Sequence, residues 1–138
     1  MSTEKNIREA SRWIKTAEDD LDSAEILKKN DKYAHACFHC RQSAEKAIKA
    51  VWYLCDADPW GHSIKKLIDD LETVDTRLFE KFKPLLRPAM VLDRFYIPTR
   101  YPNGLPDMTP DEAFAPEDAK TCIKFAGDIL AAARLLIK

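Results

Sequence analysis

Residues 32–55 read KYAHACFHCRQSAEKAIKAVWYLC, and this stretch indicates the fold class of the whole chain. Its apolar side chains recur at steps of four and three residues: Tyr33, Cys37, Cys40, Ala44, Ala47, Val51 and Leu54. That period places them on one stripe of an α-helix, whereas the side chains of a strand alternate between two faces. Several of them are small, which lets a neighbouring helix approach closely. The stretch therefore predicts a helix packed in a bundle.

The segments on both sides of this helix carry the same pattern. Residues 3–29 predict a first helix, and residues from about 116 to the C-terminus predict a last one. Asp31 is the expected N-cap of the helix at 32–55, and the turn with Pro59 and Gly61 is expected to end it. Shorter helices are predicted from Ser63 and from Thr76, with prolines splitting the second.

Composition agrees with this pattern. The chain has 138 residues, of which 46% are apolar and 33% charged, and only 3 are glycine. These proportions are typical of an ordered globular domain rich in helix. We predict an all-α fold, an up-and-down bundle of four to five helices, with residues 1–138 forming a single domain.

The charges nearly cancel, with 22 basic against 23 acidic residues and a net charge of -1. No overall field therefore draws the protein to nucleic acid or to an anionic membrane. The first residues contain no signal-peptide pattern, and no stretch approaches the roughly 20 apolar residues that cross a bilayer. We expect a cytoplasmic protein, whose cysteines act as small apolar side chains in the helical stripes.

The helix at 32–55 also carries a polar stripe, on the side opposite its apolar stripe. Its members are His35, His39, Gln42, Lys46 and Lys49. The stripe is either a solvated face or a surface that binds an anion. His35 and His39 are one turn apart, but the chain shows no further ligands at a diagnostic spacing, so we expect no metal and no cofactor.

Three further apolar residues, Phe38, Ile48 and Trp52, lie between the two stripes. Either a third helix covers them or they meet another chain. We favour a homodimer that involves this face.

Residues 93–103, DRFYIPTRYPN, lie where a helix gives way to a proline-rich loop. They contain Arg94, Tyr96, Arg100 and Tyr101. Guanidinium groups bind phosphate, and tyrosine rings stack on bases. The alternative is a packing role, in which the arginines pair with carboxylates and the tyrosines cover the end of the bundle. His62, just before the helix expected from Ser63, is a further candidate for this site, whereas Ser63 is expected to be a cap.

Four stretches occur in the order found in a known family. They are residues 17–21 (AEDDL), 38–50 (FHCRQSAEKAIKA), 61–64 (GHSI) and 96–102 (YIPTRYP). Together they resemble the HEPN family, named for higher eukaryote and prokaryote nucleotide binding, over about residues 14–136. The resemblance implies a helical bundle that is commonly dimeric. It also implies a partner, a minimal nucleotidyltransferase encoded beside it, in a two-component or toxin–antitoxin system.

One departure from the family concerns catalysis. Its ribonucleases carry an arginine followed, four to six residues later, by a histidine. Here Arg100 is followed by YPNGLPD, and all 3 histidines precede it. The usual imidazole for activating a ribose hydroxyl is therefore absent from that position, and we do not expect an enzyme.

Our first hypothesis is a homodimeric module that binds a nucleotide or a short RNA end. Arg100 and Arg94 are expected at phosphate, and Tyr96 and Tyr101 at the base. Second-rank contacts are expected from Gln42, Lys46 and His62. The alternatives are a metal-independent endoribonuclease toxin and a scaffold that only binds a partner protein.

Overall fold

A computed structural model describes residues 3–137 and shows that the fold over this range is all-helical, without a strand. Three long helices, α1, α2 and α7, form most of the bundle, and shorter ones complete it. The α-helices are α1 (Glu4–Lys29), α2 (Tyr33–Leu54), α3 (Ile64–Asp69), α4 (Thr76–Phe82), α5 (Leu86–Asp93), α6 (Pro110–Ala113) and α7 (Pro116–Leu136). Short 3-10 turns span η1 (Asp70–Thr73), η2 (Lys83–Leu85) and η3 (Pro102–Gly104). The predicted helical bundle is confirmed.

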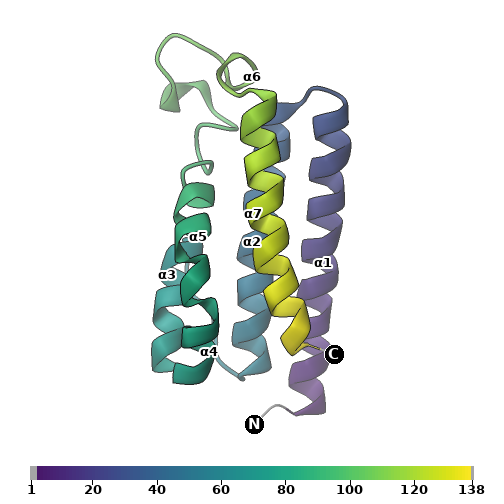
Figure 1. The fold of residues 1–138 in the computed structure, drawn as a ribbon, viewed down its shortest axis with the longest axis vertical. Coiled ribbons are helices and arrows are strands. Elements are labelled where there is room, and N and C mark those ends of the chain that lie inside the picture. Colours follow the sequence, from purple (N-terminus) through teal and green to yellow (C-terminus); the bar gives the residue numbers. More distant parts are fainter. Residues whose placement is uncertain (1–2, 138) are drawn as a thin grey trace.

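Helix α2 is the central element. Figure 1 shows it between α1 on one side and the group α3 to α5 on the other, and it also packs against α7. Its apolar stripe is fully buried at Cys37, Cys40, Ala44, Ala47 and Val51. Small side chains at these positions let α1 and α7 approach closely, as predicted. The cysteines of the described chain are free thiols, and burial raises the pKa of Cys40.

Side-chain caps define several helix ends. The hydroxyl of Thr3 accepts a hydrogen bond from the backbone N–H of Asn6 at the start of α1. Ser63 caps α3 in the same way, through the N–H of Lys66, as expected. The predicted N-cap at Asp31 is wrong: its backbone is left-handed, with φ of 62°, whereas a capping residue needs an extended backbone. Lys32 takes the N-cap position of α2 instead, without a side-chain cap.

The short helices α3 and α5 pack against α2, on the side that carries Ile48 and Trp52. Ile48 is fully buried, and the indole N–H of Trp52 donates to the carbonyl of Leu67 in α3 at 3.1 Å. The expectation that these two residues meet another chain is therefore wrong, because helices of the same chain cover them. Only Phe38 of the three stays partly accessible.

The proline-rich segment after α5 crosses the end of the bundle before α7 begins at Pro116 (Figure 1). Phe95 anchors its start, packing against Phe114 with ring centroids 5.6 Å apart. Thr99 is fully buried and donates its hydroxyl to the carbonyl of Phe95 at 2.6 Å. These contacts fix Tyr96 and Arg100 on the side of α2. Within residues 3–137, no helix has the length and apolar character needed to span a lipid bilayer.

Candidate functional site

Three aromatic rings surround the guanidinium group of Arg100. Its central carbon lies 4.6 Å from the ring centroid of Phe38, 5.0 Å from that of Tyr96 and 5.1 Å from that of Tyr101. The Nε atom donates to the carbonyl of Tyr96 at 3.2 Å, which orients the side chain. Arg100 is half-buried and forms no ion pair with any residue in the range 3–137. A guanidinium group held in this way, without a carboxylate, can accept an anionic ligand.

A second arginine, Arg41 of α2, lies beneath the same tyrosine. Only 1% of Arg41 is exposed, and its guanidinium carbon lies 4.4 Å from the ring centroid of Tyr96. Its Nη1 atom is 2.9 Å from the carboxylate of Glu45, and its Nη2 atom donates to the carbonyl of His62 and lies 3.5 Å from Asp93. The Nε atom is buried without a hydrogen-bond partner in the described chain. Burying an arginine costs free energy unless its charge is paired. The paired guanidinium group of Arg41 is therefore held in place, and it supports the ring of Tyr96 that lies on it.

Glu45 links this network to the solvent-exposed imidazole of His62. The buried carboxylate lies 3.1 Å from Nδ1 of His62 and 3.0 Å from Nζ of Lys49. Burial by itself would raise the pKa of Glu45, but the hydrogen bonds from His62 and Lys49 and the charge of Arg41 outweigh it and lower the pKa. The carboxylate is therefore ionised at neutral pH. It holds an imidazole that stacks on Tyr96 at a centroid distance of 6.0 Å.

Asp93, at the end of α5, joins the loop that carries His62 to the cluster. Its carboxylate accepts the backbone N–H groups of Ile64 and Lys65, both at 3.0 Å, and the hydroxyl of Ser63 at 3.1 Å. A carboxylate at the first turn of a helix satisfies N–H groups that have no partner within the helix. The start of α3 is thereby tied to the end of α5, which sets the distance between His62 and Tyr96.

The structure brings together most, but not all, of the residues expected at the site. Tyr96, Tyr101 and His62 lie around Arg100 and the buried network, and Gln42 accepts a hydrogen bond from Arg41 at 3.3 Å. Arg94, in contrast, is exposed, and among the described residues its side chain forms no hydrogen bond, ion pair or cation–π contact with this cluster.

The polar stripe of α2 is less solvated than a free helix face would be. Lys46 lies 2.7 Å from Asp20 of α1, and His39 lies 3.9 Å from the same carboxylate. Burial would raise the pKa of Asp20, but its interactions with the neighbouring His39 and Lys46 lower it. Lys46 therefore joins α2 to α1, and among the described residues it makes no hydrogen bond or ion pair with the Arg100 cluster. His35 is exposed, as a solvated face predicts.

The sequence analysis did not assign a role in the site to Arg41, Glu45 or Asp93. A signal was present for two of them, because Arg41 and Glu45 are spaced by four residues on a helix that is otherwise apolar on that side. A charged pair at such a position is either paired in the interior or functional. No local pattern marks Asp93, because its partners lie 28 to 52 residues earlier in the chain.

Comparison with known proteins agrees with this architecture. A family model described as "HEPN domain" matches residues 10–136. A protein of Methanocaldococcus jannaschii named "Putative toxin MJ1304" is 31% identical over 131 residues, which cover 91% of this chain and 86% of that protein.

Two solved structures are similar over almost their whole length. TT1696 from Thermus thermophilus superposes with a TM-score of 0.82 and 35% identity, covering 91% of this chain and 96% of that one. ST0689, described as an archaeal HEPN homologue, superposes with a TM-score of 0.75 and 35% identity, covering 94% of this chain and 98% of that one.

Proposed function

This chain belongs to the HEPN domain family, and from that premise we propose that it binds the phosphate of a nucleotide or of an RNA end at Arg100. The observation that carries the proposal is the guanidinium group of Arg100, which lies among three aromatic rings and has no carboxylate partner within residues 3–137. Structural arginines at half-buried positions usually pair with an acid, so an unpaired one supports a ligand role.

The surroundings of Arg100 suit both the phosphate and the base of such a ligand. Since Nε is used by the carbonyl of Tyr96, the two terminal nitrogens are the donors left for phosphate oxygens. Tyr101 is 49% exposed and presents a ring on which a base can stack. The imidazole of His62, which stacks on Tyr96, adds a further polar group to the site.

Calorimetric titration of ATP, GTP and a short RNA into the wild-type protein and into Arg100→Ala tests this proposal. Loss of a charge-assisted phosphate contact is expected to weaken binding at least about tenfold. Arg77→Ala is the matched control, because Arg77 is exposed on α4 and forms no ion pair among the described residues. Equal affinities for Arg100→Ala and wild type, with both folded, would place the ligand elsewhere. No binding by the wild type at millimolar ligand would favour the scaffold alternative.

We also propose that the protein acts as a homodimer beside a minimal nucleotidyltransferase, in a toxin–antitoxin pair. The name of the M. jannaschii relative supports the toxin part of this proposal. Apolar side chains exposed on the proline-rich segment that carries Arg100, namely Ile97, Tyr101 and Met108, support a protein contact on this segment. Light scattering should give a mass near twice 15.8 kDa. A monomer at micromolar concentration would contradict the dimer.

The pair formed by His62 and Glu45 favours a second candidate function, metal-independent cleavage of RNA. Because Nδ1 of His62 faces the ionised Glu45, Nε2 is the nitrogen left to accept a proton. His62 and Arg100 both lie against the ring of Tyr96, and this candidate requires one phosphodiester to reach both groups. The 2′-hydroxyl would lose its proton to His62 and attack phosphorus while the bond to the 5′-oxygen breaks. The 5′-oxygen would take a proton from water, leaving a cyclic phosphate, and the hydroxide formed would take up the proton held by His62.

Incubation of RNA with the protein in the presence of a chelator tests this candidate. Cleavage should persist, and it should fall at least about 100-fold in His62→Ala and in Arg100→Ala. The His62→Gln variant keeps a polar side chain and should also be inactive, because an amide does not accept a proton at neutral pH. Cleavage that needs a divalent metal, or that survives in His62→Ala, would argue against this mechanism.

A further inference from the structure

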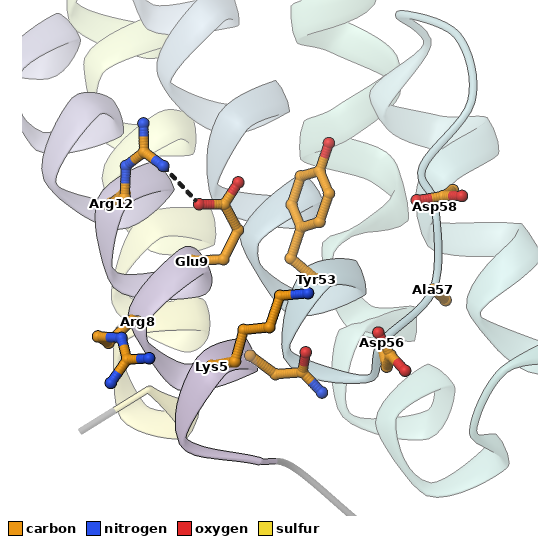
Figure 2. Close-up of a pocket in the computed structure, with 9 residues that line it drawn as sticks. Lys5, Arg8, Glu9, Arg12, Tyr53, Asp56, Ala57 and Asp58 are labelled. Carbon is orange, nitrogen blue, oxygen red and sulfur yellow. Dashed lines mark hydrogen bonds and ion pairs between the residues drawn. The ribbon is translucent and has the colours of Figure 1, made fainter.

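We propose that the cavity between the first turns of α1 and the C-terminal end of α2 is a second ligand site, for a nucleoside phosphate. The cavity has a volume of about 510 Å³, within the usual range of small-molecule sites, and is drawn in Figure 2. Lys5, Glu9 and Arg12 of α1 line one side, and Asp56 and Asp58, after α2, line the other.

This cavity lies apart from the Arg100 cluster, and the inference therefore goes beyond the proposed function. Tyr53, which lines the cavity, follows Phe38, which contacts Arg100, by 15 positions on α2. At 1.5 Å per residue, the two contacts are about 22 Å apart along the helix. One mononucleotide cannot fill both places, so the sites can be tested independently.

The α1 wall of the cavity carries three cations and one carboxylate, Glu9, whereas the opposite wall carries two carboxylates. Lys5, Arg8 and Arg12 recur at steps of three and four residues and so share one face of α1. Arg8 and Arg12 pair with Glu4 and Glu9 at 3.3 Å and 2.9 Å, but these exposed pairs contribute little stability and can exchange for a phosphate. Lys5 forms no ion pair with the described residues, and in Figure 2 its amine points towards Tyr53.

The opposite wall carries two carboxylates that receive no hydrogen bond from the described residues. Within residues 3–137, the carboxylates of Asp56 and Asp58 accept no hydrogen bond and form no ion pair. Two acidic groups facing a row of cations across a cavity suit a dipolar ligand, with an anionic end and an end that carries N–H donors. A bare inorganic anion would gain nothing from the acidic wall.

Between the walls, Tyr53 provides an aromatic surface. Its ring packs on that of Trp13 at a centroid distance of 5.1 Å, which restrains its orientation. Burial and the neighbouring Asp58 and Glu9 raise the pKa of Tyr53, so that the phenol is neutral. A nucleobase stacked here would place its amino group near Asp58 and its phosphate near the cations of α1. The aromatic ring, the carboxylates and the cations together select a nucleoside phosphate whose base carries an amino group.

Binding of AMP to the Arg100→Ala variant tests the inference, because that variant removes the first site. The chain has 3 tryptophans, so its indole N–H signals in a ¹H–¹⁵N spectrum can be assigned by substitution. AMP should shift the Trp13 signal more than those of Trp52 and Trp60. Adenosine and inorganic phosphate should each bind at least about tenfold more weakly than AMP, since each uses one half of the site.

Two variants in the same background locate the ligand. Lys5→Ala with Arg12→Ala should weaken AMP binding at least about tenfold, whereas Lys15→Ala, on α1 but outside the cavity, should not change it. Tyr53→Phe should bind as before and Tyr53→Leu more weakly, because stacking needs the ring. Three results would overturn the inference: no AMP binding in Arg100→Ala, an unchanged Trp13 signal, or equal binding of phosphate alone. Each of them leaves the proposal for Arg100 standing.

Discussion

At the scale of single residues, the chain buries a charged side chain at a position where burial of an apolar one would cost less free energy. Arg41 is 1% exposed and is surrounded by Glu45, Asp93 and the carbonyl of His62. Removing one partner from such a network usually costs more stability than the intact network contributes. Its effect here is to hold Tyr96 and His62 in fixed positions, which a site for a small anion requires.

The pH dependence of stability should report on Glu45. Its pKa is lowered in the folded protein, so the unfolded chain binds the proton more tightly. The stabilisation is therefore present above the ordinary value of 4.5 and is lost as the pH falls through the folded pKa. Glu45→Gln should lose about 2 to 3 kcal/mol of unfolding free energy at neutral pH and should show a shallower acid decline.

Urea denaturation between about pH 7 and pH 3 measures this effect. Glu80→Gln is the control, since Glu80 is exposed on α4 and forms no ion pair with the described residues. It should follow the wild type at every pH. If Glu45→Gln declines in acid as steeply as the wild type, Glu45 is not the group that titrates.

At the scale of elements, small residues decide how closely the long helices approach. Ala17 of α1, Ala44 of α2 and Ala126 of α7 are all fully buried in the one hydrophobic core. The hydroxyl of Ser43 donates to the carbonyl of Ala17 at 2.7 Å, a contact that requires α1 and α2 to lie close together. Larger residues at these positions would separate the helices and disturb the groups that α2 presents.

Ala126→Leu should therefore destabilise the bundle by about 1 to 3 kcal/mol, because a well-packed core has no room for three further carbons. Ala131→Leu is the matched control on the same helix, where the side chain is exposed and the change should be close to neutral. Thermal unfolding of both variants checks this expectation. Equal melting temperatures for the two would show that α7 packs more loosely than its buried alanines indicate.

At the scale of the whole molecule, the two candidate sites lie at different levels of the bundle. The Arg100 cluster forms where α5 ends and the proline-rich segment begins to cross towards α7 (Figure 1). The cavity of Figure 2 forms near the N-terminus of α1, beside the C-terminal end of α2. Helix α2 contributes residues to both, so its packing between α1 and the short helices positions both sites.

The sequence by itself determined the all-helical fold, the places of the long helices, and Arg100 and Tyr96 as candidate binding residues. Helical periodicity and capping depend on neighbours within about four positions, so they can be recognised along the chain. Only the tertiary structure decided that helices of the same chain cover Ile48 and Trp52. It likewise decided that Arg41 is buried beneath Tyr96 and that Glu45 holds His62. These contacts join residues 15 to 55 positions apart, and no local pattern specifies which distant side chains packing will bring together.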